Sequence, residues 1–343
     1  MTHDKGPILI IAGAGTGKTT VITRRIAWLI AEKKALPEEI LALTFTDKAA
    51  AEMEERIDAL VPYGFFDSWI STFHAFGDRI LRENALELGL PADFRVLTFL
   101  EQMIFLKEHL FELDLKILKP LSNPTRHMEA LLKHFSRLKD EDISPKDYLD
   151  WAKGANSNKS VIPATAGIQN SKGKKLDPRV PLALNVSERA GKPEDDKIMT
   201  NKEIEKYLEI ANAYKKYEEL MIKNGFLDFG DQIRMTLKLF REYPHVLKKY
   251  QKKFRYILVD EYQDTNFVQN ELIKTLVPGE GNITVVGDDD QSVYRFRGAS
   301  ISNILDFKDH YKKAKTVVLN KNYRSTKEIL NASYKLIQFN NPD

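Results

Sequence analysis

The stretch AGAGTGKTT, residues 12–20, separates two segments of different periodicity. Before it comes the apolar run ILIIAG (8–13), typical of a buried strand, and after it Ile22, Ile26 and Leu29 recur at helical spacing. A glycine-rich turn between a strand and a helix lets backbone N–H groups point at phosphate oxygens, and the helix N-terminus adds positive potential. A purely structural glycine turn is the alternative, and the flanking strand and helix make it the weaker one. The stretch therefore predicts a phosphate-binding loop.

The residues of this loop have different expected roles. Lys18 can reach the β and γ phosphates of a nucleotide, and Thr19 can offer its hydroxyl to Mg²⁺. The strict form of the pattern begins with Gly, whereas this one begins with Ala12. We expect the nucleotide to contact Ala12, Gly13, Ala14, Gly15, Thr16, Gly17, Lys18, Thr19 and Thr20.

Five further short runs rich in Ile, Val, Leu and Thr predict buried parallel strands. Most of them precede a helical pattern, such as AAAEMEERIDAL (49–60), which is built from strong helix formers. This alternation predicts an α/β fold, a P-loop NTPase parallel sheet. The five runs are ILALTF (40–45), SWISTF (68–73), YILVDE (256–261), ITVVGD (283–288) and TVVLN (316–320).

Between residues 101 and 224 helical patterns replace the strand signal, so we predict an inserted all-helical subdomain. Thr200 and Glu203 have the spacing of a capping box at the start of a helix, and Gly225 marks the end of the same helix. Ser144 and Asp147 mark a similar helix start. Within the subdomain, residues 153–199 are rich in Ser, Asn, Gly, Pro and Lys, which predicts a disordered loop. A mildly basic arm that contacts DNA is the alternative.

The segment DEYQD (260–264) ends the predicted strand YILVDE. Its acidic side chains should emerge at the carboxyl edge of the sheet, where the phosphate-binding loop also lies. Asp260 is then placed to hold Mg²⁺, and Glu261 to orient and polarise an attacking water. Acidic residues after a strand are often only helix N-caps, but together with the loop they predict an NTPase site.

Composition excludes several other classes of protein. The 343 residues contain no cysteine, which rules out disulfides and thiolate metal sites, and the seven histidines are scattered. No apolar run is long enough for a membrane span, and the start MTHDKGP is unlike a signal peptide, so we expect a cytoplasmic protein. A net charge of +3 means that any nucleic-acid site must be local.

Four further stretches are similar, in order and neighbourhood, to the helicase motifs of the UvrD/Rep family of superfamily 1. GFLDFGDQI (225–233) also resembles that family's LDFDDLL stretch, and the resemblance covers Gly6 to Asn340 apart from 153–199. It implies an ATP-dependent DNA helicase or translocase that uses Mg²⁺ and moves 3′-to-5′ on single-stranded DNA and at duplex junctions, in repair or replication. The four stretches are LTFTDKAAAEMEERI (43–57), STFHAFGDRILR (71–82), GDDDQSVYRFRGA (287–299) and NYRST (322–326).

The resemblance also implies roles for individual residues. Gln291 would sense the γ-phosphate, Tyr323 would stack on adenine, Arg324 would be an arginine finger, and Arg25 would lie near the nucleotide. For each aromatic residue the alternative is core packing. The residues expected to contact single-stranded DNA are Phe45, Thr46, Phe73, His74, Tyr294, Phe296 and Arg297.

The same resemblance implies a domain organisation. Residues 1–100 and 225–320 would form the first RecA-like lobe, 101–224 the helical insertion, and 321–343 the start of a second lobe. We expect that second RecA-like lobe to be supplied in cis or in trans. One alternative is a truncated remnant that binds ATP and single-stranded DNA without efficient turnover. Another is an RNA helicase of superfamily 1, which the residues around DEYQD favour less.

Overall fold

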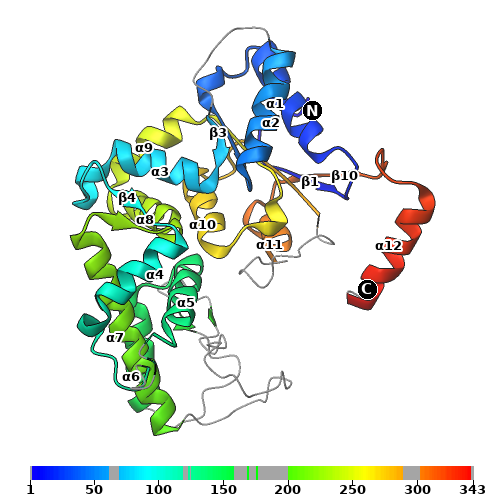
Figure 1. The fold of residues 1–343 in the computed structure, drawn as a ribbon. Helices are drawn as coiled ribbons and strands as arrows, with labels where there is room; N and C mark the ends of the chain where they lie inside the picture. The colour runs from blue at the N-terminus through cyan, green and yellow to red at the C-terminus, as the bar shows by residue number, and fades with distance from the viewer. Residues whose placement is uncertain are drawn as a thin grey trace. The chain divides into compact units, whose positions relative to one another are not determined.

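The chain folds into two compact units. The computed structural model describes residues 2–61, 69–118, 123, 125–157, 168–169, 175–176, 200–288 and 302–340. The first unit comprises Met1–Glu87 with Met235–Asp343, and the second comprises Leu88–Arg234. Figure 1 shows the parallel sheet in the first unit and a mainly helical second unit.

Six strands form the sheet of the first unit, in the order β10-β1-β9-β8-β2-β3, and every ladder is parallel. Five of the six predicted runs contain one of these strands and the sixth overlaps β10, which begins one residue earlier, so the predicted α/β parallel sheet is confirmed. The strands are β1 (Ile8–Ala12), β2 (Ile40–Thr44), β3 (Trp69–Thr72), β8 (Tyr256–Val259), β9 (Ile283–Gly287) and β10 (Lys315–Leu319).

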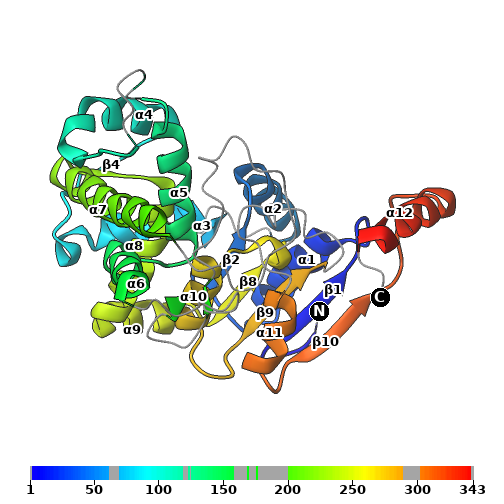
Figure 2. The same ribbon diagram turned by 90° about the horizontal axis from the view of Figure 1, so that it is seen from below.

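Helices cover both faces of this sheet (Figures 1 and 2). On one face, α1 (Lys18–Ala31) and α2 (Asp47–Leu60) pack apolar residues such as Ile22 and Met53 onto alternate strand residues such as Ile10. The period-2 alternation of the strands leaves their other side chains for the opposite face. There lie α10 (Phe267–Leu276) and α11 (Ser302–His310). The other helices assigned to this unit are α3 (Phe73–Glu83), α9 (Pro244–Lys253) and α12 (Lys327–Asn340).

The second unit has its own core, in which apolar side chains of four helices cluster around Phe135, Tyr214 and Tyr217. Its helices are α4 (Phe99–Glu108), α5 (Met128–Asp140), α6 (Pro145–Ser157) and α7 (Asn201–Lys223). The predicted capping box is present, because the Thr200 hydroxyl accepts from the Glu203 backbone while the Glu203 carboxylate accepts from the Thr200 backbone.

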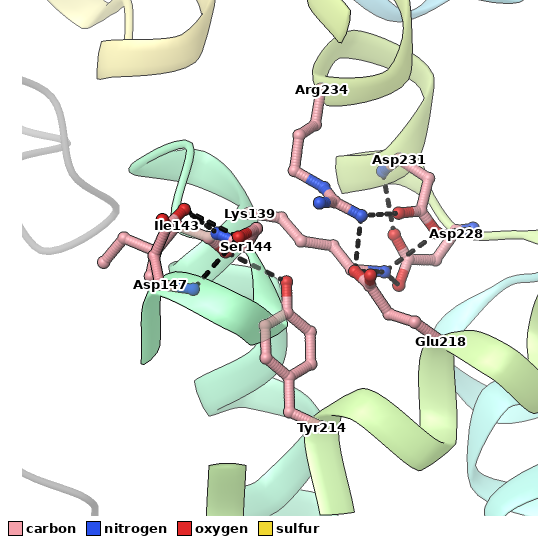
Figure 3. A network of polar contacts seen from close by, with 9 residues as sticks. All are labelled: Lys139, Ile143, Ser144, Asp147, Tyr214, Glu218, Asp228, Asp231 and Arg234. Carbon is pink, nitrogen blue, oxygen red and sulfur yellow. Dashed lines mark hydrogen bonds and ion pairs between the residues drawn. The ribbon is translucent and has the colours of Figure 1, made fainter. Parts of the chain in front are cut away.

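A buried charge network lies where the chain leaves this unit through α8 (Phe229–Glu242) (Figure 3). The Lys139 ammonium is fully buried, and it donates to Asp228 Oδ2 at 2.6 Å and to Asp231 Oδ2 at 2.8 Å. Arg234 pairs with Glu218 and with Asp231. The network therefore joins α5 and α7 to the start of α8, which is the LDFGD stretch.

The ionisation of this network follows from burial and pairing. Burial and the adjacent Asp231 carboxylate raise the pKa of Asp228 to about 6. Burial also acts to raise the pKa of Asp231, but Lys139 and Arg234 outweigh it and hold that pKa below its ordinary value. Burial would lower the pKa of Lys139, whereas the carboxylates around it raise it. The Lys139 ammonium and the Arg234 guanidinium together offset the charge of three buried carboxyl groups.

The structure differs from the sequence-based expectations in three details. The second unit extends beyond the expected 101–224, because β4 (Arg95–Val96) pairs with β7 (Phe226–Leu227) and ties its two flanks together. It is therefore not wholly helical. Most of the expected loop 153–199 lies outside the described residues, although α6 continues to Ser157 and β5 (Ile168–Gln169) pairs with β6 (Lys175–Leu176).

Within the described parts of the chain, the structure contains no helix that is both long enough and apolar enough to span a membrane.

Candidate active site

The phosphate-binding loop leaves the carboxyl end of β1 and enters α1. Gly15 and Gly17 have φ values of 74° and 93°, a region that glycine adopts without a steric penalty. The Thr16 hydroxyl donates to the Gly13 carbonyl at 2.7 Å and closes the turn. Gly17 is the N-cap of α1, and no side chain caps this helix end. The first-turn N–H groups of a helix point out of its N-terminus and have no partner within the helix. This geometry suits an anion.

The loop meets the DEYQD segment across the sheet edge. Lys18 Nζ lies 2.9 Å from Glu261 Oε2, and the Thr19 hydroxyl donates to Asp260 Oδ2 at 3.2 Å. Asp260 also accepts from the Glu261 backbone at 3.0 Å. Glu261 has a φ of 48°, a left-handed conformation that is unfavourable for a residue with a side chain. Residues that the sequence separates by about 240 positions thus form one polar cluster.

The electrostatics of this cluster favour a cation. Burial and, after it, the Glu261 carboxylate raise the pKa of Asp260 to about 6. Asp264 has a pKa of about 6 for the same two reasons. The Lys18 ammonium lowers the pKa of both Asp260 and Asp264, but it is one positive charge beside three carboxyl groups, the third being that of Glu261. Within the described residues no group of three or more His, Cys, Asp or Glu side chains could hold a metal by itself. Phosphate oxygens and water would have to complete the coordination of Mg²⁺ here.

Two residues that the sequence analysis did not single out also belong to the site. Gln263 is buried, and its amide lies between Glu261 and the backbone of Asp288. Asn322 donates from its side chain to the Ala14 carbonyl. Their positions inside DEYQD and NYRST were a signal that could have identified them.

The NYRST stretch lies against the phosphate-binding loop. The Tyr323 backbone N–H donates to the Gly15 carbonyl at 2.9 Å, and the Asn322 Oδ1 accepts from the Arg324 and Ser325 backbones at 2.8 Å each. Both Tyr323 and Arg324 are exposed. The structure therefore brings the expected adenine-stacking residue and the expected arginine finger to the loop.

Gly15→Ala should loosen the contact between the NYRST stretch and the phosphate-binding loop. An added Cβ would lie 2.6 Å from Arg324 Cβ and 3.0 Å from the Asn322 side chain. Overpacking of this kind costs about 1–3 kcal/mol, so trypsin cleavage after Arg324 should accelerate about fivefold or more. Gly89→Ala is the matched control, since Gly89 has a similar φ of 66° but open space around its Cβ position. Equal cleavage rates in the two variants would contradict the contact.

The expected DNA-contacting residues that the structure describes follow β2 and β3. Thr44 pairs with Thr72 in the sheet, so the residues after each lie at the same edge as the phosphate-binding loop. Phe45 is half-buried, and the exposed Thr46 caps α2 by accepting from Ala49. Burial lowers the pKa of His74, although the Asp47 carboxylate opposes this, which favours a neutral imidazole.

Phe73 and Arg25 are both buried in this structure. Phe73 is 2% exposed and packs as a core residue at the start of α3, so it cannot offer a face for a base in this structure. Arg25 is 1% exposed and donates to the Thr284 hydroxyl of β9 at 2.9 Å. It lies two turns along α1 from the loop, and its guanidinium stabilises the packing of that helix on the sheet. The remaining expected residues, Gln291, Tyr294, Phe296 and Arg297, lie outside the described residues.

A parallel sheet with a phosphate-binding loop after an inner strand, and acidic residues at the end of another, defines a RecA-like P-loop fold. The family model that matches residues 1–312 is the UvrD/REP helicase N-terminal domain. The chain belongs to this family.

Curated relatives agree with this assignment. The ATP-dependent DNA helicases PcrA of Bacillus subtilis, Staphylococcus epidermidis and Staphylococcus aureus are each 38% identical to the chain. Each alignment covers 98% of this chain and 38% of the relative. The chain thus spans well under half the length of these proteins.

Proposed function

We propose that this chain is the ATP-binding part of a DNA helicase, and that it binds Mg·ATP at the phosphate-binding loop and single-stranded DNA along the same sheet edge. The observation that carries the proposal is the convergence of Lys18, Thr19, Asp260 and Glu261. The names of the relatives, each an ATP-dependent DNA helicase, support the nature of both ligands.

In this proposal each residue of the cluster has one task. Lys18 exchanges its contact with Glu261 for the β and γ phosphates of ATP, and the first-turn N–H groups of α1 hold their oxygens. Thr19 and Asp260 hold Mg²⁺, which when bound neutralises charge on the phosphates. Glu261 orients the attacking water. Arg324 and Gln291 are proposed to act on the γ-phosphate, and Tyr323 on adenine.

The DNA track is proposed to include Phe45, Thr46 and His74 at the ends of β2 and β3, together with Tyr294, Phe296 and Arg297. The finer functional assignments rest on the family resemblance. They are movement in the 3′-to-5′ direction, action at duplex junctions, a cytoplasmic role in repair or replication, and a second RecA-like lobe that would begin near residue 321. The unit Leu88–Arg234 is proposed to be the helical insertion of the first lobe.

Tyr294→Ala should weaken binding of single-stranded DNA, because base stacking on an aromatic ring is typically worth about 1–3 kcal/mol, or roughly 5- to 150-fold in affinity. Fluorescence anisotropy with a short oligothymidine measures this. Tyr334→Ala is the matched control, since Tyr334 is 63% exposed on α12 and should leave affinity unchanged. A folded Tyr294→Ala protein with wild-type affinity would exclude this residue from the DNA track.

A further inference from the structure

A cavity of about 190 Å³ lies in the first unit between α1 and the edge strand β10. Figure 2 shows β10 at the edge of the sheet, beside β1. An apolar protein cavity of about 150 Å³ can hold a molecule of the size of benzene, so this one has room for a small ligand. It is lined by three basic side chains, His3, Arg25 and Lys315, and by aliphatic side chains that include Ile10, Val21 and Val317.

The basic side chains gather at the amino end of the sheet. The register pairs Ile8, the first residue of β1, with Lys315 of β10 on one side and with Thr284 of β9 on the other. The Thr284 hydroxyl accepts from Arg25 Nε at 2.9 Å, which places the guanidinium at the level of Lys315. The phosphate-binding loop follows the other end of β1, about 13 Å farther along at roughly 3.3 Å per residue. The basic end of the cavity is therefore separate from the site proposed for the phosphates of ATP.

The segment before β1 is held across this amino end. The Gly6 N–H donates to Asn282 Oδ1 at 2.9 Å, and the Tyr256 hydroxyl donates to the Asp4 carbonyl at 3.2 Å. These hydrogen bonds tie the segment to the residue before β9 and to the first residue of β8. His3, which is half-buried, is thereby kept in the wall of the cavity.

The electrostatics at this end favour an anion. Burial and, after it, the positive charges of Arg25 and Lys315 lower the pKa of His3. Arg25 is 1% exposed, and burial lowers the pKa of its guanidinium. The Asp4 carboxylate opposes this shift only in part, and it also pairs with Lys34 at the surface. A bound anion would reduce the repulsion among the basic groups and compensate the buried guanidinium.

The rest of the cavity suits a hydrocarbon. Ile10 is buried and pairs with the half-buried Val317 in the ladder between β1 and β10. Val21, in the first turn of α1, lines the same space. A guanidinium matches a carboxylate with two parallel hydrogen bonds, and aliphatic walls favour an aliphatic body. The cavity therefore fits a ligand that is anionic at one end and apolar along its length.

We propose that this cavity binds a small amphipathic carboxylate, with its charge at His3, Arg25 and Lys315 and an aliphatic chain of about six carbons between α1 and β10. The site is additional to the proposed nucleotide and DNA sites. Because α1 begins at Lys18 and β10 leads into the NYRST stretch, the ligand would join the two elements that flank the phosphate-binding loop.

The test titrates the chain with hexanoate and follows binding by ligand-observed NMR. The wild type should bind it saturably with a Kd of about 0.1–1 mM, which suits a ligand of about eight non-hydrogen atoms. Hexanol lacks the charge and should bind about tenfold more weakly or worse. Acetate lacks the aliphatic body and should be weakened at least as much, by about tenfold or more.

Two variants with matched controls locate the ligand. Lys315→Glu should weaken hexanoate binding about tenfold or more, because it puts a repelling charge at the basic end. Lys313→Glu makes the same change of net charge at an exposed residue outside the lining and should bind as the wild type does. Val317→Phe should fill the apolar part and abolish binding, whereas Val318→Phe adds the same ring at a side chain that is 62% exposed on the other face of β10 and should not. Circular dichroism checks that each variant is folded, and either cavity variant alone suffices for the test.

The outcomes separate this inference from the proposed function. Hexanoate affinity that is unchanged in a folded Lys315→Glu or Val317→Phe protein would overturn the inference, as would equal binding of hexanol or no saturable binding up to about 10 mM. Displacement of hexanoate by saturating Mg·ATP would also overturn it, because the two ligands would then share one site. A chain that binds hexanoate as expected but no nucleotide would support the inference and contradict the proposed function.

Discussion

Lys18→Ala should reduce the affinity for Mg·ATP at least about a hundredfold, close to 3 kcal/mol, which is the upper end for a hydrogen bond to a charged group. Lys18 is 9% exposed and lies 2.9 Å from Glu261 Oε2, so its ammonium is directed into the cluster. The variant loses the phosphate contact and also leaves Glu261 without the cation that offsets its charge. Isothermal titration calorimetry measures the change.

Lys34→Ala is the control for this experiment. Lys34 follows the end of the same helix and pairs with Asp4 at 3.2 Å on the surface. Its removal should leave nucleotide affinity unchanged, and circular dichroism should show that both variants are folded. Equal affinity of Lys18→Ala and the wild type would exclude the loop as the nucleotide site.

Lys139→Met should destabilise the second unit by about 3–5 kcal/mol, the usual cost of removing one partner from a buried ion pair. The ammonium is fully buried and holds both Asp228 and Asp231, with Glu218 at 3.9 Å. Its loss leaves those carboxyl groups in a low-dielectric interior with Arg234 as the neighbouring cation. Urea unfolding followed by circular dichroism reports the loss as an earlier transition.

The same helix provides the matched control. Lys133 lies on α5 with Lys139, but it is exposed and pairs with Glu129 on the surface. Lys133→Met should therefore change stability by no more than about 0.5 kcal/mol. Adding Asp228→Asn to Lys139→Met should recover part of the loss, because it removes one uncompensated carboxylate. Equal stability of the two lysine variants in urea would show that the buried Lys139 ammonium does not stabilise the second unit.

The sheet was the most predictable part of the fold. The inner strands β1, β2, β8 and β9 are short runs of mostly β-branched and aliphatic residues that are buried on both faces, and such runs stand out in a sequence. The capping residues Thr200 and Glu203 were equally visible, because a capping box depends only on residues three positions apart. Local patterns therefore predicted the elements well.

The contacts between distant segments were less predictable. Lys139 meets Asp228 across 89 positions, and no local pattern relates the two. The pair β4 and β7 has two residues in each strand, too few for a periodicity to appear. The sequence did not identify Gln263 for another reason. Its side chain accepts a hydrogen bond from the backbone of Asp288, and a backbone contact leaves no residue pattern in the sequence.

Two residues to which the family resemblance assigned roles are buried in this structure. Arg25 lies three positions after Ile22 and one before Ile26, on the face of α1 that packs on the sheet, so the helical pattern itself predicted its burial. Phe73 occupies the boundary between β3 and α3, where core packing was the alternative interpretation.

The central claim is that the loop after β1, together with Asp260 and Glu261, forms a site for Mg·ATP. Calorimetric titration of the wild-type chain with ATP, in Mg²⁺ and again in excess EDTA, tests it most directly. The account predicts one site with a Kd of about 1–100 μM in Mg²⁺, or roughly −8 to −5.5 kcal/mol, and markedly weaker binding in EDTA. No saturable binding of ATP up to about 1 mM, or identical binding with and without Mg²⁺, would contradict it.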